Sequence, residues 1–141
     1  MGVNVNDELE RVLLKKYPMF FSGVDPNHGS DMPWGIECGD GWYLILERLC
    51  QEIRGRVVKH HAPQVKFTQI KEKFGELRIY YSGLDQHVDE LIDLAVIASK
   101  SVCEMCGAQG GAQRTCHGWI KTLCTDCLSS INRNSCIVKV T

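Results

Sequence analysis

The sequence predicts an α+β protein that carries a small cysteine-rich unit at its C-terminal end. Three observations lead to this fold class: stretches with apolar residues at helical spacing, two alternating segments joined by a glycine-containing connection, and two late Cys-x-x-Cys pairs. We expect residues 1–102 to form helices packed on a short antiparallel β-hairpin. Residues 103–141 should form a module docked on that domain, because no Pro/Ser-rich linker precedes them.

Two helices are expected in the first 60 residues. Asp7 can cap a helix over 8–16, and Asp40 can cap a longer one over 41–59. The longer segment has a broad apolar face, which predicts the central helix of the core. Between them, residues 20–39 are rich in Gly, Pro, Asn and Asp, so we expect a loop that is packed by its own aromatic side chains.

A β-hairpin and a third helix are expected next. Residues 65–70 and 77–81 have the composition and alternation of strands, and the connection between them contains Gly75. Apolar residues then recur at helical spacing over 85–102. This third helix would deliver the chain directly to Cys103, the first residue of the cysteine-rich unit.

Four cysteines have the spacing of a zinc site. Cys103 and Cys106 form one Cys-x-x-Cys pair, Cys124 and Cys127 form another, and 17 residues separate the pairs. Gly107 follows the first pair and can adopt the left-handed conformation that a tight knuckle needs. Two such pairs complete a tetrahedron of thiolates, which leaves no open coordination position. We therefore expect one structural zinc ion, rather than a metal that activates water.

The order of local structure around these cysteines is typical of a treble-clef zinc finger. A knuckle comes first, a hairpin turning at Gly118 follows, and a helix then carries the second pair in its first turn. Cys116 and His117 lie in this hairpin, and either could replace a cysteine as a ligand, although such residues more often pack or face solvent. Cys50 lies on the apolar face of the second helix and is expected to be a small buried hydrophobe.

Composition limits the remaining possibilities. The 141 residues are 44% hydrophobic and 23% charged, which is ordinary for a globular protein. The formal net charge of -1 argues against a strongly electrostatic, nonspecific nucleic-acid binder. No segment approaches the roughly 18 apolar residues of a membrane span, and no basic-then-apolar leader opens the sequence. We expect a soluble, cytoplasmic protein, in which eight cysteines indicate metal binding rather than disulfides.

Basic residues cluster in two places and suggest contacts with nucleic acid or with an acidic partner. One cluster ends the second helix, and the other lies on the zinc hairpin. The alternative is that the first cluster only complements the dipole at a helix C-terminus. The candidate contact residues are Arg54, Arg56, Lys59, His60, His61, Arg114 and Lys121.

Two further interpretations are weakened by the residues themselves. Lys71, Lys73 and Arg78 could extend a basic patch over the hairpin, but two glutamates interleave with them. A nuclease of the His-Asn-His type would need a general-base histidine and a second metal-holding residue. Only His117 lies between the cysteine pairs, and no acidic residue precedes it. We therefore expect no catalytic residues.

Several motifs resemble a family of small proteins encoded by bacteriophages and prophages. The resemblance spans roughly residues 18–127. Its motifs are Gly-Ile-Glu-Cys-Gly-Asp-Gly-Trp over 35–42, Lys-Glu-Lys-Phe-Gly-Glu-Leu-Arg-Ile-Tyr over 71–80, Cys-Glu-Met-Cys-Gly over 103–107, Gly-Trp at 118–119 and Thr-Leu-Cys-Thr-Asp-Cys over 122–127. The resemblance carries no assigned activity. It implies a phage origin and the host cytoplasm as the location.

The sequence as a whole favours a non-enzymatic zinc-binding protein. The phage-like motifs imply a host protein or protein complex as the partner, including an antiviral defence system that the protein would inhibit. A nucleic-acid-binding zinc-finger module is the alternative, and a His-Asn-His-type nuclease is the third possibility. No membrane contact and no small-molecule substrate are expected.

Overall fold

The computed structural model describes residues 7–21, 35–60, 65–109, 113–115, 120–130 and 137–139. In these residues the fold is a mixture of helices and sheet, as predicted. The elements in chain order are α1 (Asp7–Lys16), β1 (Ile36–Glu37), the 3-10 helix η1 (Asp40–Trp42), α2 (Tyr43–His60), β2 (Lys66–Lys73), β3 (Glu76–Ser82), α3 (Gln86–Ser99), β4 (Gln113–Thr115), β5 (Thr122–Leu123), α4 (Thr125–Ser130) and β6 (Ile137–Lys139).

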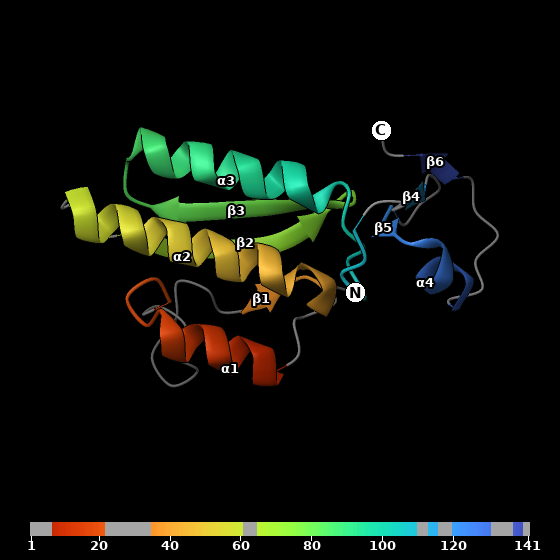
Figure 1. Ribbon diagram of the computed structural model, residues 1–141, viewed down its shortest axis with the longest axis horizontal. Coiled ribbons are helices and arrows are strands. Elements are labelled where there is room, and N and C mark those ends of the chain that lie inside the picture. The colour runs from red at the N-terminus through yellow and green to blue at the C-terminus, as the bar shows by residue number, and fades with distance from the viewer. Residues whose placement is uncertain are drawn as a thin grey trace.

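The larger part of the molecule consists of helices beside one three-stranded sheet of order β1-β2-β3 (Figure 1). Strands β2 and β3 pair antiparallel, whereas β1 pairs parallel with β2. Helices α2 and α3 run side by side along the sheet, and α1 lies beyond α2 (Figure 1). The cysteine-rich unit lies at the end of this part where α2 begins and α3 ends (Figure 1).

The core of the larger part is continuous across all of these elements. Trp42 at the end of η1, Ile53 in α2, and Ile70 and Leu77 in the sheet are each at most 1% exposed. Because apolar area removed from water contributes about 25 cal/mol per Å², this cluster supplies the main stabilisation of the fold. Cys50 belongs to the same core, as expected of a small hydrophobe, and burial raises the pKa of its thiol.

Aromatic side chains after α1 fold back onto the sheet. The ring of Phe20 lies 6.0 Å from that of Tyr17 and 6.1 Å from that of Phe67 in β2. The backbone N–H of Phe67 also donates to the carbonyl of Phe20 at 2.9 Å. The expected aromatic packing of this segment therefore includes a backbone hydrogen bond to the sheet. Residues 22–34 lie outside the described part.

Two expectations about residues 35–42 were wrong. Ile36 and Glu37, expected in a loop, pair in register with Ile70 and Lys71 as strand β1. Asp40 was expected to cap the second helix, but it lies inside the 3-10 turn that precedes α2. The cap position is Gly39, whose backbone is extended and which makes no side-chain capping bond. The reason is tertiary, since Ile36 and Glu37 pair with β2 and the cysteine-rich unit holds Gly39 and Gly41 through Glu104.

The hairpin turn is tighter than the expected six-residue connection. Only Phe74 and Gly75 separate the strands, and both have positive φ, +54° and +79°. Two-residue turns with positive φ at both positions match the twist of the strands, and they usually contain Asn-Gly or Asp-Gly. A bulky side chain in the left-handed region costs about 1–2 kcal/mol. The turn therefore stores strain at Phe74.

Helix α3 begins where expected and ends three residues early. Asp85 caps it, because its carboxylate accepts hydrogen bonds from the N–H groups of His87 and Val88 at 2.8 and 3.1 Å. The helix ends at Ser99, whose hydroxyl donates to the Val96 carbonyl and accepts from a backbone N–H in β3. Residues 100–102 then turn the chain towards the cysteine cluster.

Candidate metal centre

The first cysteine pair lies on a tight knuckle between α3 and β4. The N–H of Gly107 donates to the carbonyl of Cys103 at 2.9 Å, and the N–H of Cys103 donates to the carbonyl of Ala108 at 3.0 Å. Gly107 has φ of +81°, the left-handed conformation that was predicted for it. The knuckle therefore turns Cys103 and Cys106 towards one point.

The second pair lies at the start of α4, directly after strand β5. Cys124 precedes the helix, and its carbonyl accepts from the N–H of Leu128 at 2.9 Å. The N–H of Cys127 points at the sulfur of Cys124 at 3.4 Å. A thiolate at this position is stabilised by backbone N–H groups at the helix start. The helix therefore presents both sulfurs on one side.

The four sulfurs form one cluster that could hold a metal ion. The Sγ atoms of Cys103, Cys106, Cys124 and Cys127 all lie within 4.8 Å of one another. The Sγ atoms of Cys106 and Cys124 are 3.7 Å apart. A tetrahedron with metal–sulfur bonds of about 2.3 Å has edges of about 3.8 Å, whereas a disulfide bond is about 2.05 Å long. The spacing therefore fits ligation and excludes a disulfide between these two.

Local electrostatics prepare one of these thiols for ionisation. Burial raises the pKa of Cys103, but backbone N–H groups of Cys106, Cys124 and Met105 outweigh it and lower the pKa to about 7. Burial and the neighbouring sulfurs raise the pKa of Cys127. In the metal-free cluster the thiols thus compete for ionisation, and a divalent cation would remove that competition by binding all four as thiolates.

A buried glutamate beside the first ligand connects the cluster to the larger part of the fold. Glu104 is 2% exposed, and its Oε2 accepts from the N–H of Gly39 at 2.9 Å. Its backbone carbonyl accepts from the N–H of Gly41 at 2.7 Å. Its own N–H donates to the carbonyl of Thr122, so the two cysteine pairs are also joined to each other. Glu104 therefore holds the segment that starts α2.

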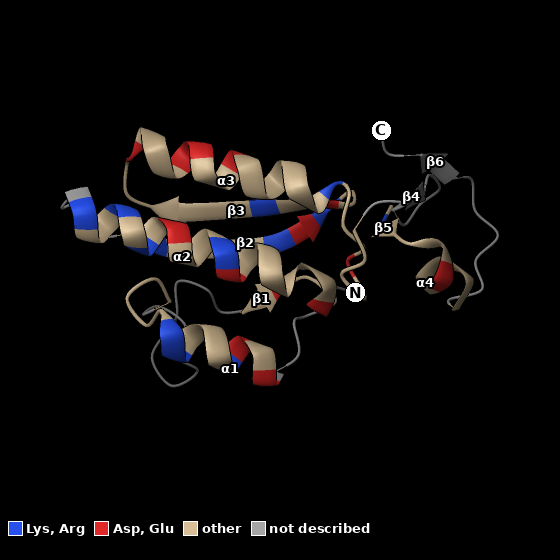
Figure 2. Ribbon diagram, in the orientation of Figure 1, with Lys and Arg blue, Asp and Glu red and all other residues tan. Residues whose placement is uncertain are grey.

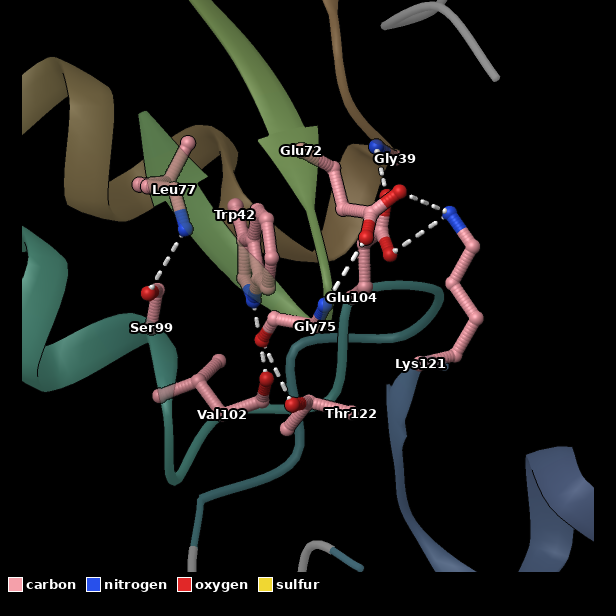
Figure 3. Close-up of polar contacts among 10 residues, drawn as sticks. All are labelled: Gly39, Trp42, Glu72, Gly75, Leu77, Ser99, Val102, Glu104, Lys121 and Thr122. Atoms are coloured by element: carbon pink, nitrogen blue, oxygen red, sulfur yellow. Dashed lines mark hydrogen bonds and ion pairs between the residues drawn. The ribbon is translucent and has the colours of Figure 1, made fainter. Parts of the chain in front are cut away.

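Lys121 neutralises Glu104 at the junction between the cysteine-rich unit and the larger part of the fold (Figure 3). Its ammonium lies 3.2 Å from Oε1 of Glu104 and 2.7 Å from Oε1 of Glu72 in β2. Lys121 was predicted as a possible contact for a partner or nucleic acid, and that prediction was wrong, because the residue is only 3% exposed. Sequence reasoning missed this role, since nothing in the local pattern shows that the two glutamates meet the lysine.

Three neutral hydrogen bonds complete the junction (Figure 3). The indole N–H of Trp42 donates to the carbonyl of Val102 at 2.8 Å. The hydroxyl of Thr122 donates to the carbonyl of Gly75 at 2.7 Å, and the Leu77 N–H donates to the hydroxyl of Ser99 at 3.1 Å. The residues that flank the cysteines are therefore anchored on the start of α2 and on the hairpin turn.

Replacing Gly41 with alanine is expected to destabilise the protein by about 1–3 kcal/mol, the cost of overpacking a fixed site. A Cβ at Gly41 would lie 2.1 Å from the carbonyl oxygen of Cys103, and this backbone cannot retreat without moving a ligand sulfur. Gly55 in α2 provides the matched control, because a Cβ there meets nothing within 4 Å. Gly55→Ala should stabilise by about 0.5–1 kcal/mol. Urea unfolding of both variants measures the difference, and equal effects would refute the close approach.

The basic run at the end of α2 does not form one patch in the structure. The guanidinium of Arg54 lies 4.9 Å from the centre of the Tyr17 ring, towards α1. The side chain of Arg56 instead lies 3.8 Å from Asp85, at the start of α3. Lys59 is exposed. The two arginines therefore point to different neighbours.

Some predicted site residues fall outside the described part of the structure. Residues 61 and 116–119 are not described, which includes His61, Cys116 and His117. Only the backbone of His60 and Arg114 is described, in α2 and β4. Their proposed roles as ligands or contacts stay predictions.

Comparison of the chain with protein-family models, curated proteins and solved structures gives no match. Among the residues that the structure describes, no helix combines the length and apolar character needed to cross a membrane. The cysteine cluster and the contacts around it are therefore the features of this protein that bear on its function.

Proposed function

We propose that Cys103, Cys106, Cys124 and Cys127 bind one structural zinc ion in a treble-clef zinc finger. Four sulfur ligands in a compact cluster suit zinc, and the thiolates would saturate its tetrahedral coordination. The order of elements supports the treble clef: a knuckle, the antiparallel pair β4 and β5, and then α4 with Cys127 in its first turn. Strand β6, which was not predicted, pairs with the other side of β4.

We further propose that the protein is not an enzyme and acts by binding another protein. The observation that carries this proposal is the set of buried contacts made by the residues beside the cysteine cluster. Glu104, Lys121 and Thr122 flank the ligands, and each makes buried contacts within the fold, which favours a structural role for them over contact with a substrate. A saturated zinc ion would supply folding free energy rather than a site for water or substrate.

The proposed partner is a host protein or protein complex, in accord with the phage-like motifs, and an antiviral defence system is the proposed target. Several large apolar side chains are exposed on the described elements, and such side chains mark a protein-binding site where they form one contiguous area. They include Leu44, Val58, Phe74, Leu84, Leu94 and Ile97.

Two measurements test this proposal together. Elemental analysis of the purified protein should find about one zinc per chain, and a metal-free protein in which the cysteine-rich unit is still folded would refute the zinc site. Affinity capture from a host lysate, followed by mass spectrometry, should recover a defined protein with the zinc-loaded chain. A Cys124→Ser bait controls for nonspecific capture. Recovery of nucleic acid instead of protein would overturn the binding proposal.

A further inference from the structure

The second half of α3 is apolar on nearly all of its sides. The eight residues of 91–98 include a single charged side chain, that of Asp93. Ile92 is buried in the core of the larger part. On the opposite side of the helix, however, Leu94 is 62% exposed and Ile97 is 60% exposed. A helix that is hydrophobic all round is normally covered on every face, so the outer side of α3 is expected to have a partner.

The exposed apolar side chains of α3 form one ridge. Leu94 and Ile97 are three residues apart, which makes them neighbours on the surface of a helix. Leu91 and Ala98, about one turn to either side of Leu94, are half-buried and extend the apolar strip. Among the described residues, neither Leu94 nor Ile97 belongs to a buried cluster. We call Leu94 and Ile97 the α3 ridge.

Charges beside the α3 ridge are separated along the helix (Figure 2). Asp89, Glu90 and Asp93 lie in its first and middle turns, and α3 itself contains no lysine or arginine. Lys100 follows the last turn and lies 3.6 Å from Glu76. Within the described part of the chain, Asp93 has no hydrogen-bond or ion-pair partner. The outer side of α3 is therefore negative before the ridge and positive after it.

An antiparallel second copy of α3 complements the ridge and the charges together. With a two-fold axis between Leu94 and Ile97, Leu94 of each copy lies against Ile97 of the other. Asp93 and Lys100 are seven residues apart, close to two full turns, so they share one flank of the helix. The two-fold axis keeps that flank on the same side and reverses its direction. Lys100 of each copy then lies within about one turn of Asp93 of the other.

We propose that the protein forms a two-fold dimer through α3, with the α3 ridge at its centre and Asp93 beside Lys100 of the other copy. This inference goes beyond the proposed function and does not depend on it. Burial of the ridge drives the association, and the charge pairs select the antiparallel orientation. A basic helix of another protein would pair with Asp93 but would repel Lys100, whereas a second copy pairs with both. An anionic membrane surface is disfavoured, because it repels the acidic side chains of α3.

The oligomeric state of the zinc-loaded protein tests the dimer. Sedimentation velocity should show a monomer–dimer equilibrium between about 1 and 200 µM, because small interfaces give transient complexes. Leu94→Gln should weaken the dimer about 30-fold or more, since the two-fold axis removes a central side chain twice. Glutamine is a good helix former at this exposed position, so circular dichroism should show unchanged helix content.

The matched control for the ridge is Val58→Gln. It removes another exposed apolar side chain, 69% exposed, from the end of α2 and should leave the dimer unchanged. A wild-type protein that stays monomeric at about 200 µM would overturn the proposal, since even a transient dimer forms in that range. Equal weakening in Leu94→Gln and Val58→Gln would overturn the assignment to α3.

A charge exchange tests the antiparallel orientation. Asp93→Lys alone brings like charges together at both ends of the ridge, and Lys100→Glu alone does the same. Each variant should weaken its own dimer about tenfold at low salt. A mixture of the two variants restores opposite charges at both ends, so native mass spectrometry should find heterodimers in excess over either homodimer. A mixture without that excess would overturn the antiparallel pairing.

Discussion

Replacing Cys124 with serine is expected to abolish stoichiometric zinc binding and to unfold the cysteine-rich unit, while most of the larger part stays folded. Among the described residues, the cluster of buried side chains in this unit contains Cys103, Leu123 and Leu128, with Cys124 and Cys127 packed against it. A unit of about 39 residues is too short to build a core that offsets the loss of chain entropy. Structural zinc contributes about 10–16 kcal/mol to folding such units, so removing one ligand removes their main source of stability.

Hydrogen exchange measured by mass spectrometry locates the effect. Peptides that cover 103–109 and 120–130 should lose protection, whereas those from α2, β2 and α3 should keep most of theirs, because the larger core is continuous without the metal. A strong chelator should reproduce the pattern in the wild-type protein. Cys50→Ala is the matched control, because this buried cysteine lies in the core of the larger part. The variant should retain one zinc per chain. Full zinc content in Cys124→Ser would contradict the site.

Lys121→Met is expected to destabilise the zinc-loaded protein by about 3–5 kcal/mol, the cost of breaking a buried ion pair from one side. The variant leaves the carboxylates of Glu72 and Glu104 facing each other without their shared cation. Methionine keeps much of the volume, so the loss reflects charge more than packing. Lys100→Met is the control: this lysine is exposed and lies 3.6 Å from Glu76, and its loss should cost less than about 1 kcal/mol.

The pH dependence of the stability loss in Lys121→Met tests whether the buried charges cause that loss. Burial raises the pKa of Glu104, and Lys121 opposes that rise. Without Lys121, the pKa of Glu104 in the folded protein rises further above its value in the unfolded chain. A carboxyl whose folded pKa is raised loses stability as pH rises through that pKa. In urea unfolding, the stability loss of Lys121→Met should therefore grow as the pH rises from below to above the folded-state pKa of Glu104. Adding Glu104→Gln should restore part of the stability that Lys121→Met loses. A stability loss that changes neither with pH nor with Glu104→Gln would exclude the electrostatic explanation.

Much of the local structure follows from local sequence. Helical spacing predicts α1, α2 and α3, and Asp85 caps α3 because a short carboxylate can reach the first free N–H groups of a helix. The spacing of Cys103, Cys106, Cys124 and Cys127 predicts the cluster, because two knuckles bring four sulfurs together whatever surrounds them. These features depend on residues close together in the chain.

Features that depend on distant residues were not predictable from local patterns. Strand β1 exists because Ile36 and Glu37 meet β2, and Asp40 fails as a cap because Glu104 holds the glycines beside it. Lys121 looks like a surface cation in the sequence, but two glutamates meet it at the junction. A charged residue is exposed by default, and only an unforeseen partner makes its burial favourable.

By itself, the sequence determined the fold class, the three main helices, the hairpin and the four clustered cysteines of this protein. Only the tertiary structure decided what surrounds that cluster. It placed Glu104 against the glycines that precede α2, turned Glu72 towards Lys121, and gave Phe74 a positive φ in the hairpin turn. The physical reason is the distance along the chain between the interacting residues. The spacing of residues predicts contacts within one element, whereas burial, charge pairing and strain arise where elements that are distant in sequence meet.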